Sequence, residues 1–288
     1  MNKLSIVTTT NRIDGWFDYC KHIGHLQDIY GDKFDVIILD NSNKHTFEIK
    51  KDMLLSHLGN GKKTIKMMHF DTFTECRNQQ RFQIETPFMT ILDDDDQLCD
   101  GFLSIFNFLL DLLTSVDYIN LSKIKYGIKE LNTGYAVKSL SSPADKLDNF
   151  NDYDNYSEDR LTKVYPINGY CILSTDLYKE FGETIQHYVD DCYPMMKCLI
   201  NCKFGYKVSL PWQFYKTQNN FMFDTKGPEN CDKSFAIQIE KLWEEYHEQY
   251  GKLILKQLVN VKKSLSLYKT FNPKMLNELY YKLNNDWT

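Results

Sequence analysis

The alternation of strand-like and helix-like segments in its N-terminal third constrains the fold of this 288-residue chain most strongly. Short apolar runs predict strands, and segments with apolar residues at helical spacing predict the helices between them. The expected strands are residues 4–7, 34–39, 64–70 and 88–92, and the expected helices are residues 14–30, 47–58, 74–85 and 101–113. This order predicts an α/β fold with a mixed, mainly parallel sheet flanked by helices.

Three of the expected strands run directly into clusters of polar residues. Residues 8–12 read Thr-Thr-Thr-Asn-Arg, residues 40–43 read Asp-Asn-Ser-Asn, and residues 93–96 are four consecutive aspartates. In sheets of this class, ligands bind at the carboxyl ends of the strands. We therefore expect the three clusters to converge on one edge of the sheet and to form the functional site there.

The four aspartates are the most demanding cluster, because adjacent like charges must be solvated, paired or bound to a cation. Carboxylate oxygens suit Mg²⁺ or Mn²⁺, and Mg²⁺ is usually held by one or two carboxylates together with substrate phosphates. In an extended Asp-x-Asp segment, two carboxylates lie on the same side. Asp93 and Asp95 are thus candidate ligands for Mn²⁺ or Mg²⁺, and the alternative is a solvated acidic turn.

Arginine is scarce in this chain, whose formal net charge is −5, and three of the four arginines fall near expected strand ends: Arg12, Arg77 and Arg81. A guanidinium group can hold a phosphate through two parallel hydrogen bonds. Arg77 and Arg81 are four residues apart and share a helix face, where the alternative is solvation or an ion pair with Glu85. We expect at least one of them to serve the site.

Composition excludes several classes of protein. A hydrophobic content of 42% and an aromatic content of 14% exclude wholesale disorder. No apolar run approaches the ~20 residues of a transmembrane segment, and the first ten residues lack the pattern of a signal peptide. Eight cysteines without an export signal predict reduced thiols and a cytoplasmic protein. The mild acidity gives no whole-protein footprint for nucleic acid, although a local basic groove stays open.

The rest of the chain is expected to complete the domain and to extend it. Residues 127–165 are rich in Asn, Asp, Ser and Tyr and predict a long loop or an insertion. Residues 166–173 and 206–210 predict strands, and residues 177–181 and 193–202 predict helices. Beyond residue 233 the apolar residues keep a helical period. We therefore expect one α/β domain over residues 1–230 and a helical C-terminal extension over residues 231–288.

Taken in order, these motifs and two later ones resemble those of family 2 glycosyltransferases with the GT-A fold, which is Rossmann-like. The matching segments are residues 8–12, residues 40–42, Arg77-Asn78, residues 93–96 (like the Asp-x-Asp-Asp of the family), Asn168-Gly169 and Asp190-Asp191. Asp93 lies 16 residues beyond Arg77, a spacing that is also typical of the family. The resemblance covers about residues 3–215.

The resemblance implies a set of site residues. They are Thr8, Thr10, Arg12, Asp40, Arg77, Asp93 and Asp94 for the nucleotide-sugar, Asp95 and Asp93 for the metal, Asp191 and Asp190 for catalysis, and Asn168 and Gly169 on the acceptor side. Asp40 would bond the base, commonly uracil. Asp191 would be the general base on the acceptor hydroxyl, with Asp190 as the alternative. The chain departs from the family at Asp190, which replaces a glutamate, at Asn41, which replaces an acidic residue, and at Cys76, which replaces an alanine.

The function that the resemblance implies is metal-dependent glycosyl transfer. A hexosyl or pentosyl group would pass with inversion from a nucleotide-sugar, UDP-linked by the habit of the family, to a hydroxyl of a surface saccharide. The metal, Mn²⁺ or Mg²⁺, would neutralise charge on the diphosphate leaving group.

Other functions stay open at the level of sequence. Some phage glycosyltransferases modify hydroxylated bases in DNA, and lysines of the C-terminal extension could form a basic strip for that acceptor: Lys252, Lys256, Lys262, Lys263 and Lys269. The same aspartates could serve a metal-dependent nuclease or phosphotransferase. They could also belong to a non-catalytic cation-binding module.

Overall fold

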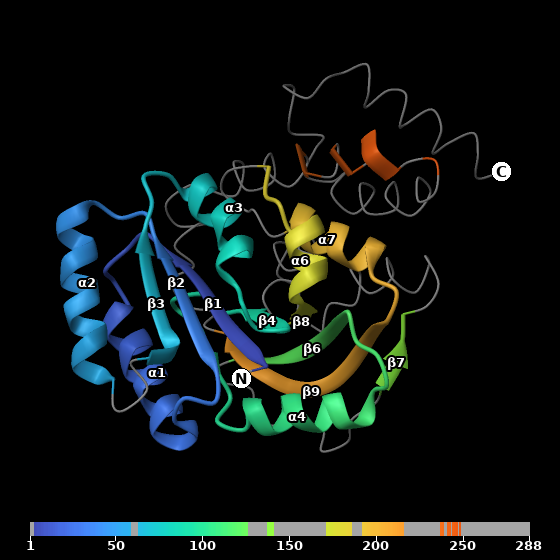
Figure 1. The fold of residues 1–288 in the computed structure, drawn as a ribbon, viewed down its shortest axis with the longest axis horizontal. Helices are drawn as coiled ribbons and strands as arrows, with labels where there is room; N and C mark the ends of the chain where they lie inside the picture. The colour runs from blue at the N-terminus through green and yellow to red at the C-terminus, as the bar shows by residue number, and fades with distance from the viewer. Residues whose placement is uncertain are drawn as a thin grey trace.

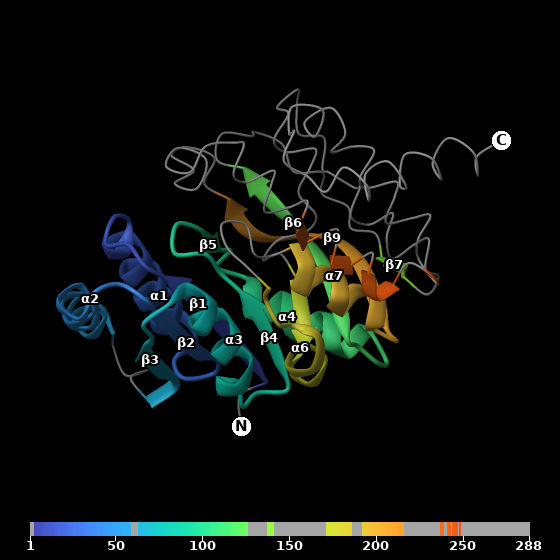
Figure 2. The same cartoon turned by 90° about the horizontal axis from the view of Figure 1, so that it is seen from above.

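The computed structural model describes residues 3–58, 63–125, 137–140, 171–185 and 192–215, together with residues 237, 238, 241, 242, 244–246 and 248. Most of the expected insertion over residues 127–165 and most of the expected extension over residues 231–288 lie outside the described residues. In the described part, nine strands form one sheet that is covered by helices on both faces (Figures 1 and 2). The expected α/β class with a mixed sheet is confirmed.

The elements follow one another as the N-terminal alternation predicts. The strands are β1 (Leu4–Thr10), β2 (Asp35–Asp40), β3 (Ile65–His69), β4 (Phe88–Ile91), β5 (Gln97–Leu98), β6 (Tyr118–Lys125), β7 (Val137–Ser139), β8 (Cys171–Ser174) and β9 (Gly205–Tyr215). The helices are α1 (Trp16–Tyr30), α2 (Lys44–His57), α3 (Phe73–Gln83), α4 (Phe102–Leu112), α6 (Thr175–Phe181) and α7 (Cys192–Asn201).

The sheet has the order β3-β2-β1-β4-β8-β6-β9-β5, and β7 pairs with β9. Strands β1 to β4 are parallel to one another, with Thr10 opposite Asp40 at the carboxyl ends of β1 and β2. Beyond β4 the direction changes, because β8 runs antiparallel to both β4 and β6, while β6 and β9 are parallel. The carboxyl ends of the first four strands therefore lie along one edge.

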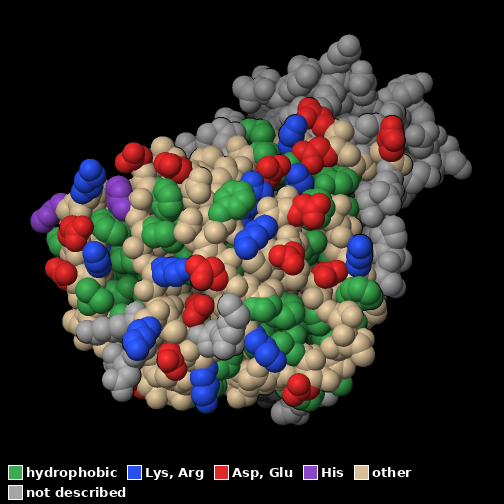
Figure 3. Space-filling view, in the orientation of Figure 1, with side chains coloured by type: hydrophobic (Ala, Val, Ile, Leu, Met, Phe, Trp, Pro, Cys, Tyr) green, Lys and Arg blue, Asp and Glu red, His purple; other side chains and the backbone are tan. Residues whose placement is uncertain are grey.

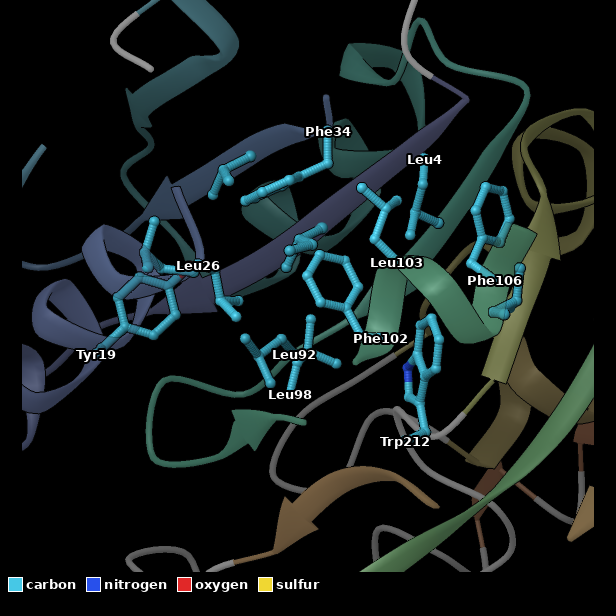
Figure 4. Packing of buried hydrophobic residues seen from close by; sticks show 14 of the residues in the cluster. Leu4, Tyr19, Leu26, Phe34, Leu92, Leu98, Phe102, Leu103, Phe106 and Trp212 are labelled. Carbon is cyan, nitrogen blue, oxygen red and sulfur yellow. The ribbon is translucent and has the colours of Figure 1, made fainter. Parts of the chain in front are cut away.

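Strand β1 is buried over its whole length because each of its faces contacts a separate hydrophobic cluster. Leu4 and Ile6 point into the cluster that α1, α2 and α4 cover, and Figure 4 shows Leu4 there with Phe102 and Trp212. Val7 points into the other cluster, which α3, α6 and α7 cover. Two-sided burial explains the continuous apolar run at the start of the chain.

Side-chain caps fix where two of the helices begin. The Asn43 side chain accepts the Thr46 N–H at the start of α2, and the Thr72 side chain accepts the Glu75 N–H at the start of α3. Such caps satisfy backbone donors that the helix itself leaves unpaired. Each of these helices therefore starts at a fixed point beyond the strand that precedes it.

Within the described residues, no helix combines the length and the apolar character that crossing a membrane requires.

Candidate functional site at the carboxyl ends of the parallel strands

A buried chain of polar contacts joins the ends of β1 and β2 to the loop after β4. The Lys50 ammonium of α2 forms an ion pair with Asp40 and donates to Thr10 Oγ1 at 2.8 Å. Thr10 Oγ1 in turn donates to Asp94 Oδ2 at 2.5 Å. The side chains of Lys50 and Asp40 are fully buried. The expected convergence of the three polar clusters on one edge is confirmed by these contacts.

Arg12 extends this chain of contacts to the next aspartate. Its guanidinium donates to Asp94 Oδ1 at 2.6 Å through Nη2 and at 3.1 Å through Nε, and the same Nη2 lies 2.7 Å from Asp95 Oδ2. Burial alone would lower the pKa of Arg12, but the two carboxylates raise it above its usual value. Arg12 therefore stays charged and offsets part of the negative charge of residues 93–96, the four aspartates after β4, which we call the acidic loop.

The four aspartates divide into two pairs with different surroundings. Asp94 is buried, and so is Asp96, whose Oδ2 accepts a hydrogen bond from Gln213 Nε2 of β9 at 2.6 Å. Asp93 and Asp95 keep 43% and 28% of their side-chain surface exposed. The two alternate aspartates therefore present carboxylates at the surface. They do so from a turn, in which the Asp96 N–H donates to the Asp93 carbonyl at 3.1 Å, and not from the extended segment that the prediction assumed.

These two carboxylates fit a divalent cation that a phosphate-bearing ligand helps to hold. Asp95 engages Arg12 through Oδ2, and Asp93 Oδ1 lies 4.0 Å from Arg77 Nη2. A Mg²⁺ or Mn²⁺ site of one or two carboxylates draws its other ligands from phosphates and water. In agreement with so small a protein donor set, the described residues contain no group of three or more His, Cys, Asp or Glu that could hold a metal.

Asp40 has no surface left for a ligand in this arrangement. Its Oδ1 accepts from the Ser42 backbone N–H at 2.7 Å and from the Ser42 hydroxyl, while Oδ2 accepts from Lys50. The role of Asp40 on a nucleobase stays a prediction, and it would require one of these partners to move. Lys50 itself is a residue that sequence reasoning missed.

The signal that could have revealed Lys50 is its position on α2. Lys50 and Leu54 are the buried residues of this helix, and they lie one turn apart. Burial lowers the pKa of the Lys50 ammonium, and the ion pair with Asp40 opposes that shift. The ammonium also lies 4.4 Å from the centre of the Trp16 ring. A lysine on the apolar stripe of an amphipathic helix indicates a buried partner of opposite charge.

Two buried polar atoms at the same edge have no hydrogen-bond partner among the described residues. They are Asn41 Oδ1, directly after β2, and Gln80 Nε2 of α3. The other end of the Gln80 amide is engaged, because Oε1 accepts from Thr9 Oγ1 at 3.0 Å. An unpaired buried acceptor and an unpaired buried donor are costly unless a ligand or water satisfies them. Sequence reasoning missed Gln80 and treated Asn41 only as a departure from the family.

The remaining predicted site residues fall into three groups. Thr8 is buried and accepts from the Tyr19 hydroxyl at 2.8 Å, so it supports β1 from inside. Arg77 lies at the acidic loop, whereas Arg81 points away and donates to the Lys179 carbonyl at 3.2 Å. The predicted residues outside the described part of the chain are Asn168, Gly169, Asp190 and Asp191.

Comparison with known proteins shows a likeness of structure without a likeness of sequence. No protein-family model and no curated protein sequence matches the chain. The structure is similar to that of S. aureus TarS, with a TM-score of 0.60 and 15% identity over 93% of this chain and 46% of the TarS chain. The chain therefore spans about half the length of that protein.

Two further structures contain nucleotide-sugars. TarS 1-349 in complex with UDP-GlcNAc gives a TM-score of 0.59 and 16% identity over 94% of this chain and 77% of the other. The mannosyltransferase PcManGT from Pyrobaculum calidifontis, in complex with GDP-Man and Mn²⁺, gives a TM-score of 0.54 and 12% identity over 98% of this chain and 80% of the other. At these identities the likeness shows the fold, and the expected GT-A class is confirmed.

Proposed function

We propose that this chain is a metal-dependent glycosyltransferase that moves a sugar from a nucleotide-sugar to an acceptor hydroxyl. The observation that carries the proposal is the meeting of Arg12, Arg77 and the two exposed carboxylates of the acidic loop at one strand edge. Cations of this kind bind phosphate, and the carboxylates suit the metal that accompanies a diphosphate. The same fold binds UDP-GlcNAc in TarS 1-349 and GDP-Man with Mn²⁺ in PcManGT, which supports the proposal.

The donor in this proposal is UDP-linked, and Arg77 contacts its diphosphate. The guanidinium of Arg77 lies at the acidic loop, with Nη2 4.0 Å from Asp93 Oδ1. Asn41 Oδ1 and Gln80 Nε2 supply an acceptor and a donor for the base or ribose. Thr8, Thr10, Asp40 and Asp94 then support the nucleotide pocket from inside.

Asp95 and Asp93 would hold Mn²⁺ or Mg²⁺, which supplies charge neutralisation at the diphosphate leaving group when it is bound. Arg12 fixes the orientation of the Asp95 carboxylate. In the transfer step, Asp191 takes the proton of the acceptor hydroxyl as general base, with Asp190 as the alternative. We assign Asn168 and Gly169 to the acceptor side. A general base opposite the leaving group gives inversion.

The acceptor in this proposal is a saccharide rather than DNA. The face shown in Figure 3 intersperses Lys and Arg with Asp and Glu, whereas a duplex-binding face gathers basic side chains into a stripe. The lysines predicted for a DNA acceptor lie outside the described residues: Lys252, Lys256, Lys262, Lys263 and Lys269. We also propose a cytoplasmic location. It is supported by six described cysteines that are not assigned to a disulfide: Cys20, Cys76, Cys99, Cys171, Cys198 and Cys202.

Calorimetry with UDP, UDP-GlcNAc and GDP-Man, each with and without Mn²⁺, tests the donor and the metal. We expect UDP and a UDP-sugar to bind in the presence of Mn²⁺. Asp95→Asn should weaken that binding about 10-fold or more by removing a metal ligand. Asp100→Asn is the matched control, since it removes the same charge from an aspartate with 71% side-chain exposure just beyond the acidic loop. A wild-type protein that binds no nucleotide with Mn²⁺ or Mg²⁺ would contradict the proposal.

A further inference from the structure

The segment that contains Asp190 and Asp191 is held at both of its described ends by side-chain amides. On the entering side, the Thr184 backbone N–H donates to Asn78 Oδ1 of α3 at 3.0 Å. On the leaving side, the Tyr193 backbone N–H donates to Gln238 Oε1 at 2.8 Å. Tyr193 lies in the first turn of α7, where backbone N–H groups have no partner inside the helix. Gln238 comes from the C-terminal part of the chain and satisfies one of these groups.

A cluster of charged side chains joins the same two ends to each other. The Lys197 ammonium of α7 lies 3.1 Å from Glu183 Oε1, next to Thr184, and 3.2 Å from Glu245 Oε2 in the C-terminal part. Lys197 also donates to the Tyr193 hydroxyl at 3.0 Å, and that hydroxyl donates to Glu245. On the side of α3, Arg81 Nη2 lies 3.7 Å from Glu183 Oε2. One network therefore ties α3, α7 and the C-terminal part together.

Burial makes these contacts costly to lose. Gln238 is 1% exposed, and Leu242 is fully buried in the hydrophobic cluster that α7 helps to form. Burial raises the pKa of the Tyr193 phenol and the neighbouring Glu245 raises it further, so the phenol keeps the proton that it donates. A buried donor or acceptor that loses its partner costs about 1–3 kcal/mol. The C-terminal part thus holds the start of α7 firmly against the catalytic sheet.

We propose that Gln238 and Glu245 are positioning residues for the general base of the proposed glycosyl transfer. They anchor the start of α7, the helix that follows Asp191 directly in the chain. The inference rests on the proposed function, because a base has a role only if the transfer occurs. Misplacement of a catalytic group by about 1 Å can reduce a rate about 100-fold. The C-terminal part is then a component of the catalytic unit rather than a separate appendage.

Two variants and two controls test this role. Gln238→Leu removes the acceptor of the Tyr193 N–H, and Glu245→Gln weakens the network at Lys197. Gln238→Glu keeps an acceptor oxygen and should restore activity. Glu244→Gln makes the same change next to Glu245, at a side chain that is 57% exposed and whose partner Lys241 lies outside the network. The measurements are kcat for hydrolysis or transfer of the UDP-sugar that binds most tightly, the Kd of UDP, and hydrogen exchange over residues 184–193.

The two variants should lower kcat about 10-fold or more, keep the Kd of UDP within about 2-fold, and speed exchange over residues 184–193. Unchanged exchange in both variants would overturn the anchoring. Faster exchange with unchanged kcat would overturn the positioning role, and a parallel loss of UDP affinity would show a general structural role instead. If Gln238→Leu does not fold, Glu245→Gln decides. If the wild type binds no nucleotide, the proposed function fails, and the exchange result still decides whether the anchor exists.

Discussion

Lys50 sets the internal charge balance of the candidate site, because it is the buried cation beside Asp40. Lys50→Met should destabilise the fold by about 3–5 kcal/mol, since it leaves a buried carboxylate without its partner. Lys51→Met is the control, because the neighbouring Lys51 is exposed on α2. Urea unfolding measures the free energy of unfolding of both variants. Adding Asp40→Asn to Lys50→Met should recover part of the lost stability. Equal stability of the two methionine variants would show that Asp40 finds another partner.

His22 should make the stability of the protein sensitive to acid. Its Nε2 accepts the Leu98 N–H of β5 at 3.0 Å, which requires a neutral imidazole. Burial, with a smaller effect of His25, lowers the pKa of His22 to about 4, while Asp100 opposes the shift. Because the unfolded chain takes up the proton first as pH falls from about 6.5, the stabilisation is complete above that pH and is lost down to about 4.

His22→Gln should therefore reduce the stability difference between pH 7 and pH 4 by about 3 kcal/mol, while its side chain can still accept the Leu98 N–H. His25→Gln, on the exposed side of the same helix, should reduce that difference much less, because His25 makes only the smaller contribution to the lowered pKa of His22. Urea unfolding at the two pH values measures it. If the stability difference is as large in His22→Gln as in the wild type, groups other than His22 cause the acid sensitivity.

At the scale of elements, the close approach of α1 and α2 depends on Gly24. A Cβ at this position would lie 2.5 Å from the backbone oxygen of His57, at the end of α2. Gly24→Ala should destabilise the protein by about 1–2 kcal/mol despite the better helix propensity of alanine, because backbone must shift. Gly101→Ala, where a Cβ meets nothing within 4 Å, should cost less than about 1 kcal/mol. Thermal unfolding compares the stability of the two variants. A larger loss in Gly101→Ala than in Gly24→Ala would show that α2 can shift away from α1 at little cost.

Helix and strand patterns in the sequence predict the N-terminal half well and the strands beyond it poorly. Strands β1 to β4 form where the apolar runs predict them. Strand β6 was missed, since its apolar residues follow neither strict alternation nor one continuous run: Tyr118, Ile119, Leu121 and Ile124. Strand β9 continues through Pro211, where the prediction ended. The register shifts on both sides of Ser122, the partner of Pro211, show an irregularity that accommodates the proline.

At the scale of the whole molecule, the sequence predicts where the site lies better than what each residue does there. Strand order places Arg12, Asp40 and the acidic loop on one edge, because the ends of parallel strands meet. It does not reveal that Lys50 forms an ion pair with Asp40 or that Asn78 accepts the Thr184 N–H, since these contacts depend on how helices pack on the sheet. Tertiary contacts between distant segments carry this information. The place of Lys50 on the apolar stripe of α2 indicates a buried partner of opposite charge, but it does not identify that partner.

The division of the acidic loop has a thermodynamic consequence. Asp94 and Asp96 are committed to protein partners, and Arg12 offsets part of the charge on Asp95. The field with which Asp93 and Asp95 attract a divalent ion is therefore weak, and the phosphates of the donor must supply the remaining negative charge. Mn²⁺ and UDP should each tighten the binding of the other by the same factor, about 10-fold or more. Titrations of each in the absence and presence of the other measure it, and independent binding would show that the protein alone completes the cation site.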